Sequence, residues 1–386
     1  MQKIAIYTID YLPERERLMP WRTVAEVAKY LHGQGHDVTI LNGYSDATEI
    51  KDFVTGKVPV KGIRHSYPTL VDVVRDMEIS TVAVPVTWRD GLKDWSAFKK
   101  TNCKKVAYFA GGVYRVQDAL KLWRGSSLGI SKPYLLESIV PKYVLTRKLA
   151  DAGFTEVVGL TPYTAERVVQ HPPLKVSYIL PGKDAFEALP EDMAILRKYN
   201  LEGKKFLLYT GAPSPVRGSE WLLQAVGRIQ AADFQLVMLM RTDVGSDFQR
   251  FEQKLKQLKH PERVVIVCEK LTREQLKAFF SHAYAMVLPF IVIPSEIPLT
   301  YYEALSCGTP VVTFSNGGTT QYLKGLSLAR KSVEELARKM AELWTDTSLR
   351  KYLSQEAIAC MSGHPNWLEV GCQWEQMLID YEISDN

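Results

Sequence analysis

Short apolar runs alternate with amphipathic stretches along the whole chain. The first run covers residues 3–9, and a helical pattern with apolar residues three or four apart follows over 21–33. The alternation recurs with apolar runs at 35–41, 81–86, 105–110, 156–161, 205–211, 235–240, 264–268 and 285–289. Continuous apolar runs of this length are typical of parallel strands that are covered on both faces. The pattern therefore predicts an α/β protein built from doubly wound sheets.

Residues 285–318 combine this alternation with polar groups suited to a ligand. An apolar strand leads to a polar turn at 294–296, a short helix and a second strand. The amides at the start of the helix, at Leu299 and Thr300, have no intrahelical partner and favour an anion. Glu303 lies one turn further, and its carboxylate can accept two hydrogen bonds from a vicinal diol such as a ribose. The stretch points to a nucleotide diphosphate, and the alternative is an ordinary buried turn whose Glu303 faces solvent.

The same stretch resembles the C-terminal signature of retaining GT-B glycosyltransferases of the family-4 type. In that signature a Glu is followed, after seven residues, by a second Glu, an Ala, a Gly-x-Pro-Val segment and a Gly-Gly loop. Residues 303–312 and the glycine pair at 317–318 match this order. The resemblance implies that Glu303 holds the donor ribose. Ser295 stands at the position of the first Glu, which contacts the donor sugar in the family, and Glu296 is the neighbouring carboxylate.

A second motif opens the C-terminal half of the chain. Gly211, Arg217 and Gly218 match the spacing of the diphosphate-binding loop in the family. The resemblance implies that Arg217 binds the donor diphosphate, while Ala212 replaces the Arg that the family has at its position. Arg241, at the carboxyl end of an apolar run, is a candidate for the second positive charge.

The nucleobase and the acceptor are assigned to three further segments. Lys270 and Leu271 lie at the exit of the strand whose backbone meets the nucleobase in the family. In the loop after the first strand, where the family has a Gly-Gly pair, an Arg either meets the donor phosphates directly or serves the acceptor. The loop after 105–110 lacks the His that the family usually places there. The residues assigned to the acceptor side are Trp21, Arg22, Gly111, Gly112 and Tyr114.

The resemblance spans nearly the whole chain and implies the GT-B fold, two Rossmann-like domains facing a central cleft. Residues 181–186 resemble the crossing between the domains of the family. This crossing divides the chain into an acceptor-side domain at 1–182 and a nucleotide-sugar-binding domain at 183–364. Residues 365–386 are expected to form a helix that crosses back to the first domain. The length of 386 residues suits two such domains.

Composition narrows the class of protein. The net charge of +5 is too small to indicate nucleic acid, but it suits an anionic substrate or an anionic membrane surface. The five scattered cysteines favour reduced thiols in a cytoplasmic protein. Apolar residues begin too close to Met1 for a signal peptide, and no run is long enough for a membrane span. Residues 114–153, rich in aromatic and basic side chains, form either helices at the acceptor mouth or membrane interface, or ordinary helices packed on the sheet.

These features predict a hexosyltransferase that moves a sugar from a nucleotide diphosphate sugar to an acceptor hydroxyl with retention at the anomeric carbon. The donor is expected to be UDP- or GDP-linked, and the acceptor to be a glycan, a lipid-linked molecule or a small molecule in cell-surface polysaccharide or glycoconjugate assembly. No metal or other cofactor is expected, because cations and helix dipoles neutralise the leaving diphosphate. Arg217 and Glu296 are the predicted catalytic residues. The alternatives are a non-catalytic GT-B protein that binds a nucleotide or glycan or supports a partner, and another GT-B enzyme such as an epimerase or phosphorylase.

Overall fold

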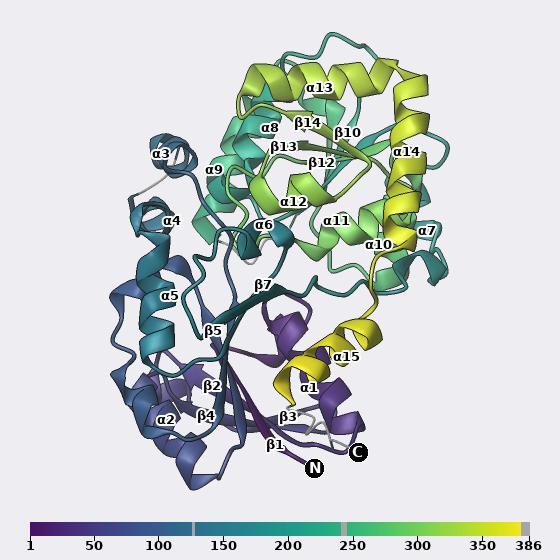
Figure 1. The fold of residues 1–386 in the computed structure, drawn as a ribbon. Helices are drawn as coiled ribbons and strands as arrows, with labels where there is room; N and C mark the ends of the chain where they lie inside the picture. The colour runs from purple at the N-terminus through teal and green to yellow at the C-terminus, as the bar shows by residue number, and fades with distance from the viewer. Residues whose placement is uncertain (126–127, 241–244, 380–386) are drawn as a thin grey trace.

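The computed structural model describes residues 1–125, 128–240 and 245–379, which form two parallel sheets with helices packed around them (Figure 1). The first sheet has eight strands in the order β3-β4-β2-β1-β5-β6-β7-β8, and the second has six in the order β11-β10-β9-β12-β13-β14. Neighbouring strands are parallel in both sheets, with the exception of the β3–β4 hairpin. The predicted α/β class is confirmed.

The strands that carry the two sheets are short and mostly buried. In the first sheet they are β1 (Lys3–Ile9), β2 (Asp37–Tyr44), β3 (Phe53–Thr55), β4 (Val58–Arg64), β5 (Thr81–Val86), β6 (Lys104–Phe109), β7 (Glu156–Gly159) and β8 (Lys175–Tyr178). In the second they are β9 (Leu207–Gly211), β10 (Leu236–Met240), β11 (Val264–Val267), β12 (Ala285–Leu288), β13 (Val311–Phe314) and β14 (Leu326–Ala329). Alternate residues of β9 enter two different apolar clusters, Leu207 and Tyr209 in one and Leu208 in the other, so both faces of this sheet are covered.

The helices connect successive strands, as a doubly wound sheet requires. Those that belong with the first sheet are α1 (Trp21–Gly33), α2 (Tyr67–Asp76), α3 (Val116–Gly125), α4 (Leu128–Ile139), α5 (Lys142–Asp151) and α6 (Pro162–Ala165). The remaining helices are α7 (Ala194–Lys198), α8 (Ser219–Val226), α9 (Gly245–Lys256), α10 (Arg273–His282), α11 (Leu299–Ser306), α12 (Gly317–Tyr322), α13 (Val333–Thr345), α14 (Thr347–Ser362) and α15 (Trp367–Leu378). The predicted helices within residues 114–153 are α3, α4 and α5.

Two chain segments pass between the halves of the molecule, and they lie side by side. The backbone N–H of Lys183 donates to the carbonyl of Pro365 at 2.9 Å, and Lys183 forms an isolated parallel bridge with Asn366. Helix α15 then returns to the first half and packs on α1, as Figure 1 shows in yellow and purple. Tyr30 and His36 there contact Glu375 of α15 through hydrogen bonds of 3.1 Å. The exact domain limits at residues 182 and 364 stay a prediction.

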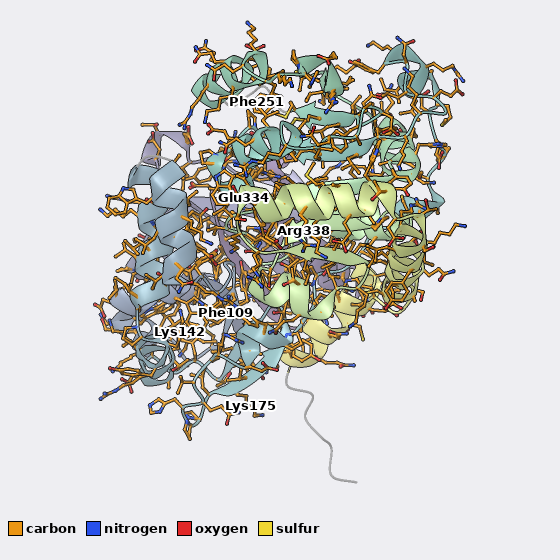
Figure 2. The ribbon with its side chains drawn as sticks, turned by 90° about the horizontal axis from the view of Figure 1, so that it is seen from above. Phe109, Lys142, Lys175, Phe251, Glu334 and Arg338 are labelled. Atoms are coloured by element: carbon orange, nitrogen blue, oxygen red, sulfur yellow. The ribbon has the colours of Figure 1, made fainter. Side chains whose placement is uncertain are left out.

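All five cysteines are free thiols. Within the described ranges, no helix is both long and apolar enough to cross a membrane. Figure 2 looks down on the second half of the molecule, where Glu334 and Arg338 mark α13 in yellow-green across the middle of the view.

Candidate functional site

A cleft of about 630 Å³ lies between the two halves of the molecule. Residues of the loop after β1 and of α1 line one side, and residues of the loops and helices at the carboxyl ends of the second sheet line the other. Ligands of doubly wound sheets bind outside the carboxyl ends of the strands, and this cleft has that position. Seven of the predicted site residues line it: Trp21, Arg22, Arg217, Ser295, Leu299, Thr300 and Glu303.

Glu303 projects into the cleft from the first turns of α11 and is half-buried. Throughout the described chain, no group donates a hydrogen bond to its carboxylate. Burial raises the pKa of Glu303 to about 7, and the charge of Asp184 adds to the rise, against the opposing charges of Arg273, Arg17 and Arg22. A half-buried carboxyl without a protein partner is suited to a ligand that brings hydroxyl donors.

Arg217 lies on the same side of the cleft, at the end of a one-turn 3-10 helix that precedes α8. Its guanidinium carbon is 5.3 Å from the centre of the Phe290 ring, and it forms no ion pair with any described residue. Gly211 and Gly218 do not line the cleft, but Gly211 makes room for this arginine and Gly218 for the carbonyl of Pro289. A Cβ at Gly211 would lie 2.6 Å from Arg217 Nη1, and Gly218 adopts a left-handed φ of 67° against Pro289.

The start of α11 offers backbone donors beside these side chains. Pro298 is its N-cap residue, and no side chain caps the helix. Pro298, Leu299 and Thr300 all line the cleft, as does Ser295 in the preceding turn. The free amides and the helix dipole favour an anion at this end of α11, in the cleft that Arg217 and Glu303 also line.

A cluster of ion pairs forms another part of the wall. Asp184 accepts hydrogen bonds from Arg22 at 2.9 Å, from Arg273 at 3.1 Å and from the indole of Trp367 at 3.0 Å. The cluster therefore joins α1, the crossing segment, α10 and α15. Arg22, which we assigned to the acceptor side, is engaged in this cluster, whereas Arg17, in the loop before α1, is exposed and has no ion pair with the described residues.

Glu296 lies outside the cleft, in the contact between the two halves. It is 4% exposed, and its two carboxylate oxygens accept hydrogen bonds from Thr161 at 2.5 Å and from Thr164 at 2.7 Å. Burial raises its pKa, and the two threonines oppose the rise. Its backbone has a positive φ of 58°, and its carbonyl accepts from Thr319. The catalytic role of Glu296 stays a prediction, which this geometry does not favour because both oxygens are already occupied.

Gly111, Gly112 and Tyr114, assigned to the acceptor side, lie behind the cleft rather than in its lining. The hydroxyl of Tyr114 donates to the carbonyl of Pro294 at 2.6 Å and accepts from the backbone N–H of Gly112 at 3.0 Å. A Cβ at Gly112 would lie 3.3 Å from the carbonyl of Ile293. This loop therefore presses on the second half of the molecule just beside the cleft.

The last predicted residues lie elsewhere. Lys270 is exposed, Leu271 packs in the second core, and neither lines the cleft. Arg273 and Leu276, on the helix that follows them, do line it. Arg241 lies outside the described residues. In the ranges 1–125, 128–240 and 245–379, no group of three His, Cys, Asp or Glu side chains is placed to hold a metal ion.

Sequence reasoning missed several lining residues. Asp184 could have been predicted from the sequence, because it lies in the segment that resembles the interdomain crossing. The signal for Arg273 was weaker, since it begins a helix soon after a strand. Tyr134 lines the cleft from α4, where nothing in the sequence distinguishes it from neighbouring apolar positions.

Comparison with known proteins agrees with this architecture. The model of the family described as Glycosyl transferases group 1 matches residues 192–359. No curated protein matches the sequence. Among solved structures, a sucrose-phosphate synthase from Thermosynechococcus elongatus has a TM-score of 0.75 at 17% identity, over 98% of both chains.

Two further structures share the fold over their whole length. A glycosyltransferase from Rickettsia africae has a TM-score of 0.69 at 15% identity, over 97% of both chains. Anabaena HepE, solved in complex with UDP and glucose, has a TM-score of 0.67 at 15% identity, over 98% of this chain and 99% of its own. Residues 192–359 are therefore similar to the glycosyl transferases group 1 family, and the chain as a whole has the GT-B fold of two Rossmann-like domains.

Proposed function

We propose that this protein is a retaining, metal-independent glycosyltransferase that uses a UDP- or GDP-linked sugar as its donor. One observation carries the proposal: the unpartnered carboxylate of Glu303 and the unpaired guanidinium of Arg217 face the same interdomain cleft, with the uncapped start of α11 also in its wall. A diol acceptor, a cation and free amides in one cleft match the ribose and the diphosphate of a nucleotide sugar. The family match and the UDP and UDP-glucose complexes of HepE support the same donor class.

In this proposal Glu303 accepts two hydrogen bonds from the ribose hydroxyls. Arg217, the exposed Arg17 and the amides of Leu299 and Thr300 meet the diphosphate. Their fixed charges and dipoles are aimed at the negative charge that develops as the bond between the sugar and the phosphate breaks. The acceptor approaches over Trp21 at the start of α1.

The set of carboxylates supports retention without a protein nucleophile. In the described lining of the cleft, Asp184 and Glu303 are the only carboxylates. Asp184 is bound to two arginines, and Glu303 is assigned to the ribose. The acceptor hydroxyl would therefore attack from the side of the leaving phosphate, its oxygen bonding to the anomeric carbon while its proton passes to the departing phosphate oxygen.

The acceptor is proposed to be a hydroxyl of a glycan, a lipid-linked molecule or a small molecule of cell-surface assembly. An apolar stripe on α3 supports contact with an anionic membrane. Val116, Leu120 and Trp123 recur at helical spacing and are 40%, 38% and 51% exposed. Sedimentation with anionic and neutral vesicles tests this contact, and equal recovery of the wild type and Trp123→Ser with anionic vesicles would argue against it.

A thermal-shift panel of UDP, GDP, ADP and their sugars, with EDTA and with Mg²⁺, tests the proposed donor. A ligand at one hundred times its dissociation constant stabilises the folded state by about 2.7 kcal/mol. We expect a shift for one nucleotide family that is unchanged by EDTA and is lost in Glu303→Ala and Arg217→Ala. Glu252→Ala, exposed on α9, is the control.

Two results would contradict the proposal. A shift that survives both cleft substitutions would overturn the assignment of the site. The absence of a shift with every nucleotide would favour the non-catalytic GT-B protein that supports a partner or binds a glycan.

A further inference from the structure

Glu137, in the first domain, is a buried carboxyl with no hydrogen-bond partner for one of its oxygens. Glu137, on α4, is 5% exposed. Its Oε1 is 3.8 Å from the Nε of Arg89, and its Oε2 has no hydrogen-bond partner among the described residues. Lys142 donates to the backbone carbonyl of Glu137, not to its carboxylate. A buried polar atom without a partner costs stability, so it calls for an explanation.

The unpartnered oxygen faces the bare backbone of Gly111. A Cβ placed on Gly111 would lie 3.6 Å from Glu137 Oε2, 3.6 Å from the hydroxyl oxygen of Tyr114 and 3.3 Å from Cγ2 of Thr87. The missing side chain thus leaves room for about one heavy atom beside a carboxyl. The phenol of Tyr114 is already committed to Pro294 and Gly112, so Glu137 is the group in this niche that is free to accept a hydrogen bond.

The niche adjoins the end of the cleft where a donor sugar would project. Tyr134, one turn before Glu137 on α4, lines the cleft and packs edge-to-face on Tyr114 with ring centres 5.1 Å apart. Pro294, which binds the hydroxyl of Tyr114, also lines the cleft. If the ribose lies at Glu303 and the diphosphate beside Arg217, as proposed above, we expect the sugar to project toward this wall.

We propose that Glu137 and the bare Cα of Gly111 form a niche that binds one hydroxyl of the sugar being transferred. The inference rests on the proposed function, and it assigns the recognition of the sugar to a side chain outside both C-terminal motifs. Oε2 is buried in this structure, so the sugar reaches it only when side chains of the cleft wall move. Glu137 is then a binding residue for the donor sugar and not for the nucleotide.

The charges around the niche suit a hydroxyl ligand. Burial raises the pKa of Glu137 to about 7; Arg89 and Lys142 oppose the rise, and Asp90 adds to it. Burial and the charge of Glu137 together raise the pKa of Tyr134 to about 12 and that of Tyr114 well above its ordinary value. Both phenols therefore stay neutral, and a hydroxyl can donate to the carboxylate or accept from the acid.

Calorimetric titration with UDP and with UDP-glucose, or with the matching pair that the nucleotide panel selects, tests the niche. Gly111→Ala fills it, and Glu137→Leu removes its acceptor while keeping an apolar side chain of similar length in the core. For each variant we expect UDP to bind within twofold of the wild type and UDP-glucose to bind about tenfold more weakly. Gly363→Ala is the matched control, because a Cβ there meets nothing within 4 Å.

The outcomes separate this inference from the proposed function. Unchanged UDP-glucose binding in both variants overturns the niche, and so does an equal loss of UDP and UDP-glucose, which would mark a structural role. If Gly111→Ala does not fold, Glu137→Leu decides alone. A wild-type protein that binds neither ligand overturns the proposed function instead.

Discussion

Glu296 and Glu303 stand seven residues apart in the chain, yet their surroundings are opposite. Glu296 lies in the contact between the domains, and both of its carboxylate oxygens are bound by threonine hydroxyls. Glu303 lies in the cleft and has no hydrogen-bond donor in the described chain. Glu137, on α4, is similar to Glu303 because its Oε2 also has no hydrogen-bond donor in the described chain. A carboxyl with both oxygens satisfied holds the domains together, whereas an unsatisfied one is available to a ligand.

Removing the carboxylate of Glu296 should have the largest effect on the free energy of unfolding. Glu296→Ala leaves the hydroxyls of Thr161 and Thr164 buried without their acceptor. Hydrogen bonds to charged groups contribute about 1.5–3 kcal/mol each, so we expect the free energy of unfolding to fall by about 4 kcal/mol. Urea denaturation at pH 7 measures it. Glu303→Ala is the counterpart and should lose less than about 1 kcal/mol; equal losses in the two variants would remove the distinction.

The next largest predicted effect is the loss of stability caused by ionising the buried carboxyl of Glu137 at high pH. Because its pKa is about 7 in the folded protein against an ordinary value of 4.5, the folded state binds this proton more tightly than the unfolded chain. That contribution is complete below pH 4.5 and is lost as the pH rises through 7. Glu137→Gln should therefore match the wild type near pH 4.5 and exceed its stability by up to about 3 kcal/mol at pH 8.

Thermal unfolding of the two proteins between pH 4.5 and 8 measures this difference. Glu252→Gln, on the exposed face of α9, controls for the amide itself. A constant difference between Glu137→Gln and the wild type across this range would show that Glu137 titrates as an ordinary carboxyl and is not held at a cost.

The smallest predicted effect is a dependence of UDP-glucose affinity on pH, which tests the role of Glu303. Its pKa of about 7 leaves about one carboxyl in ten ionised at pH 6, and the ionised form accepts both ribose hydroxyls. UDP-glucose, whose phosphates do not titrate in this range, should bind about tenfold more weakly at pH 6 than at pH 8. The measurement belongs in the Glu137→Gln background, where Glu303 is the carboxyl of the pair that still titrates. An affinity that is flat with pH there, or that keeps its slope in Glu303→Gln, would contradict the assignment.

The sequence predicted the parts of the site that lie close together in the chain. Glu303, Leu299 and Thr300 belong to one strand–turn–helix unit, and Arg217 belongs to another. The spacing of apolar residues in each unit, together with the resemblance to GT-B glycosyltransferases, placed these side chains at the carboxyl edge of a sheet. The two-domain α/β architecture followed from the same alternation of strands and helices.

The rest depends on contacts between distant segments. Arg22, Asp184 and Arg273 meet because three separate segments converge on the cleft, and no local pattern encodes that meeting. Glu296 was assigned to chemistry because of its neighbour in sequence, but its left-handed backbone turns its side chain toward the first domain. Glu137 sits in an apolar helix, where only the structure shows which glycine it faces.

The paired crossing between the domains has a consequence for motion. Two domains joined by a single connector can both bend and twist about it. Here a second segment of the chain runs beside Lys183 and is hydrogen-bonded to it through Pro365 and Asn366. Gly182 is also packed against Trp367 so closely that a Cβ would lie 2.8 Å from its backbone nitrogen. Two connections fixed to each other remove torsional freedom and leave bending as the easy motion. We therefore expect any closing movement to return the two walls of the cleft to the same alignment, so that a donor held on one wall meets the other wall at the same point.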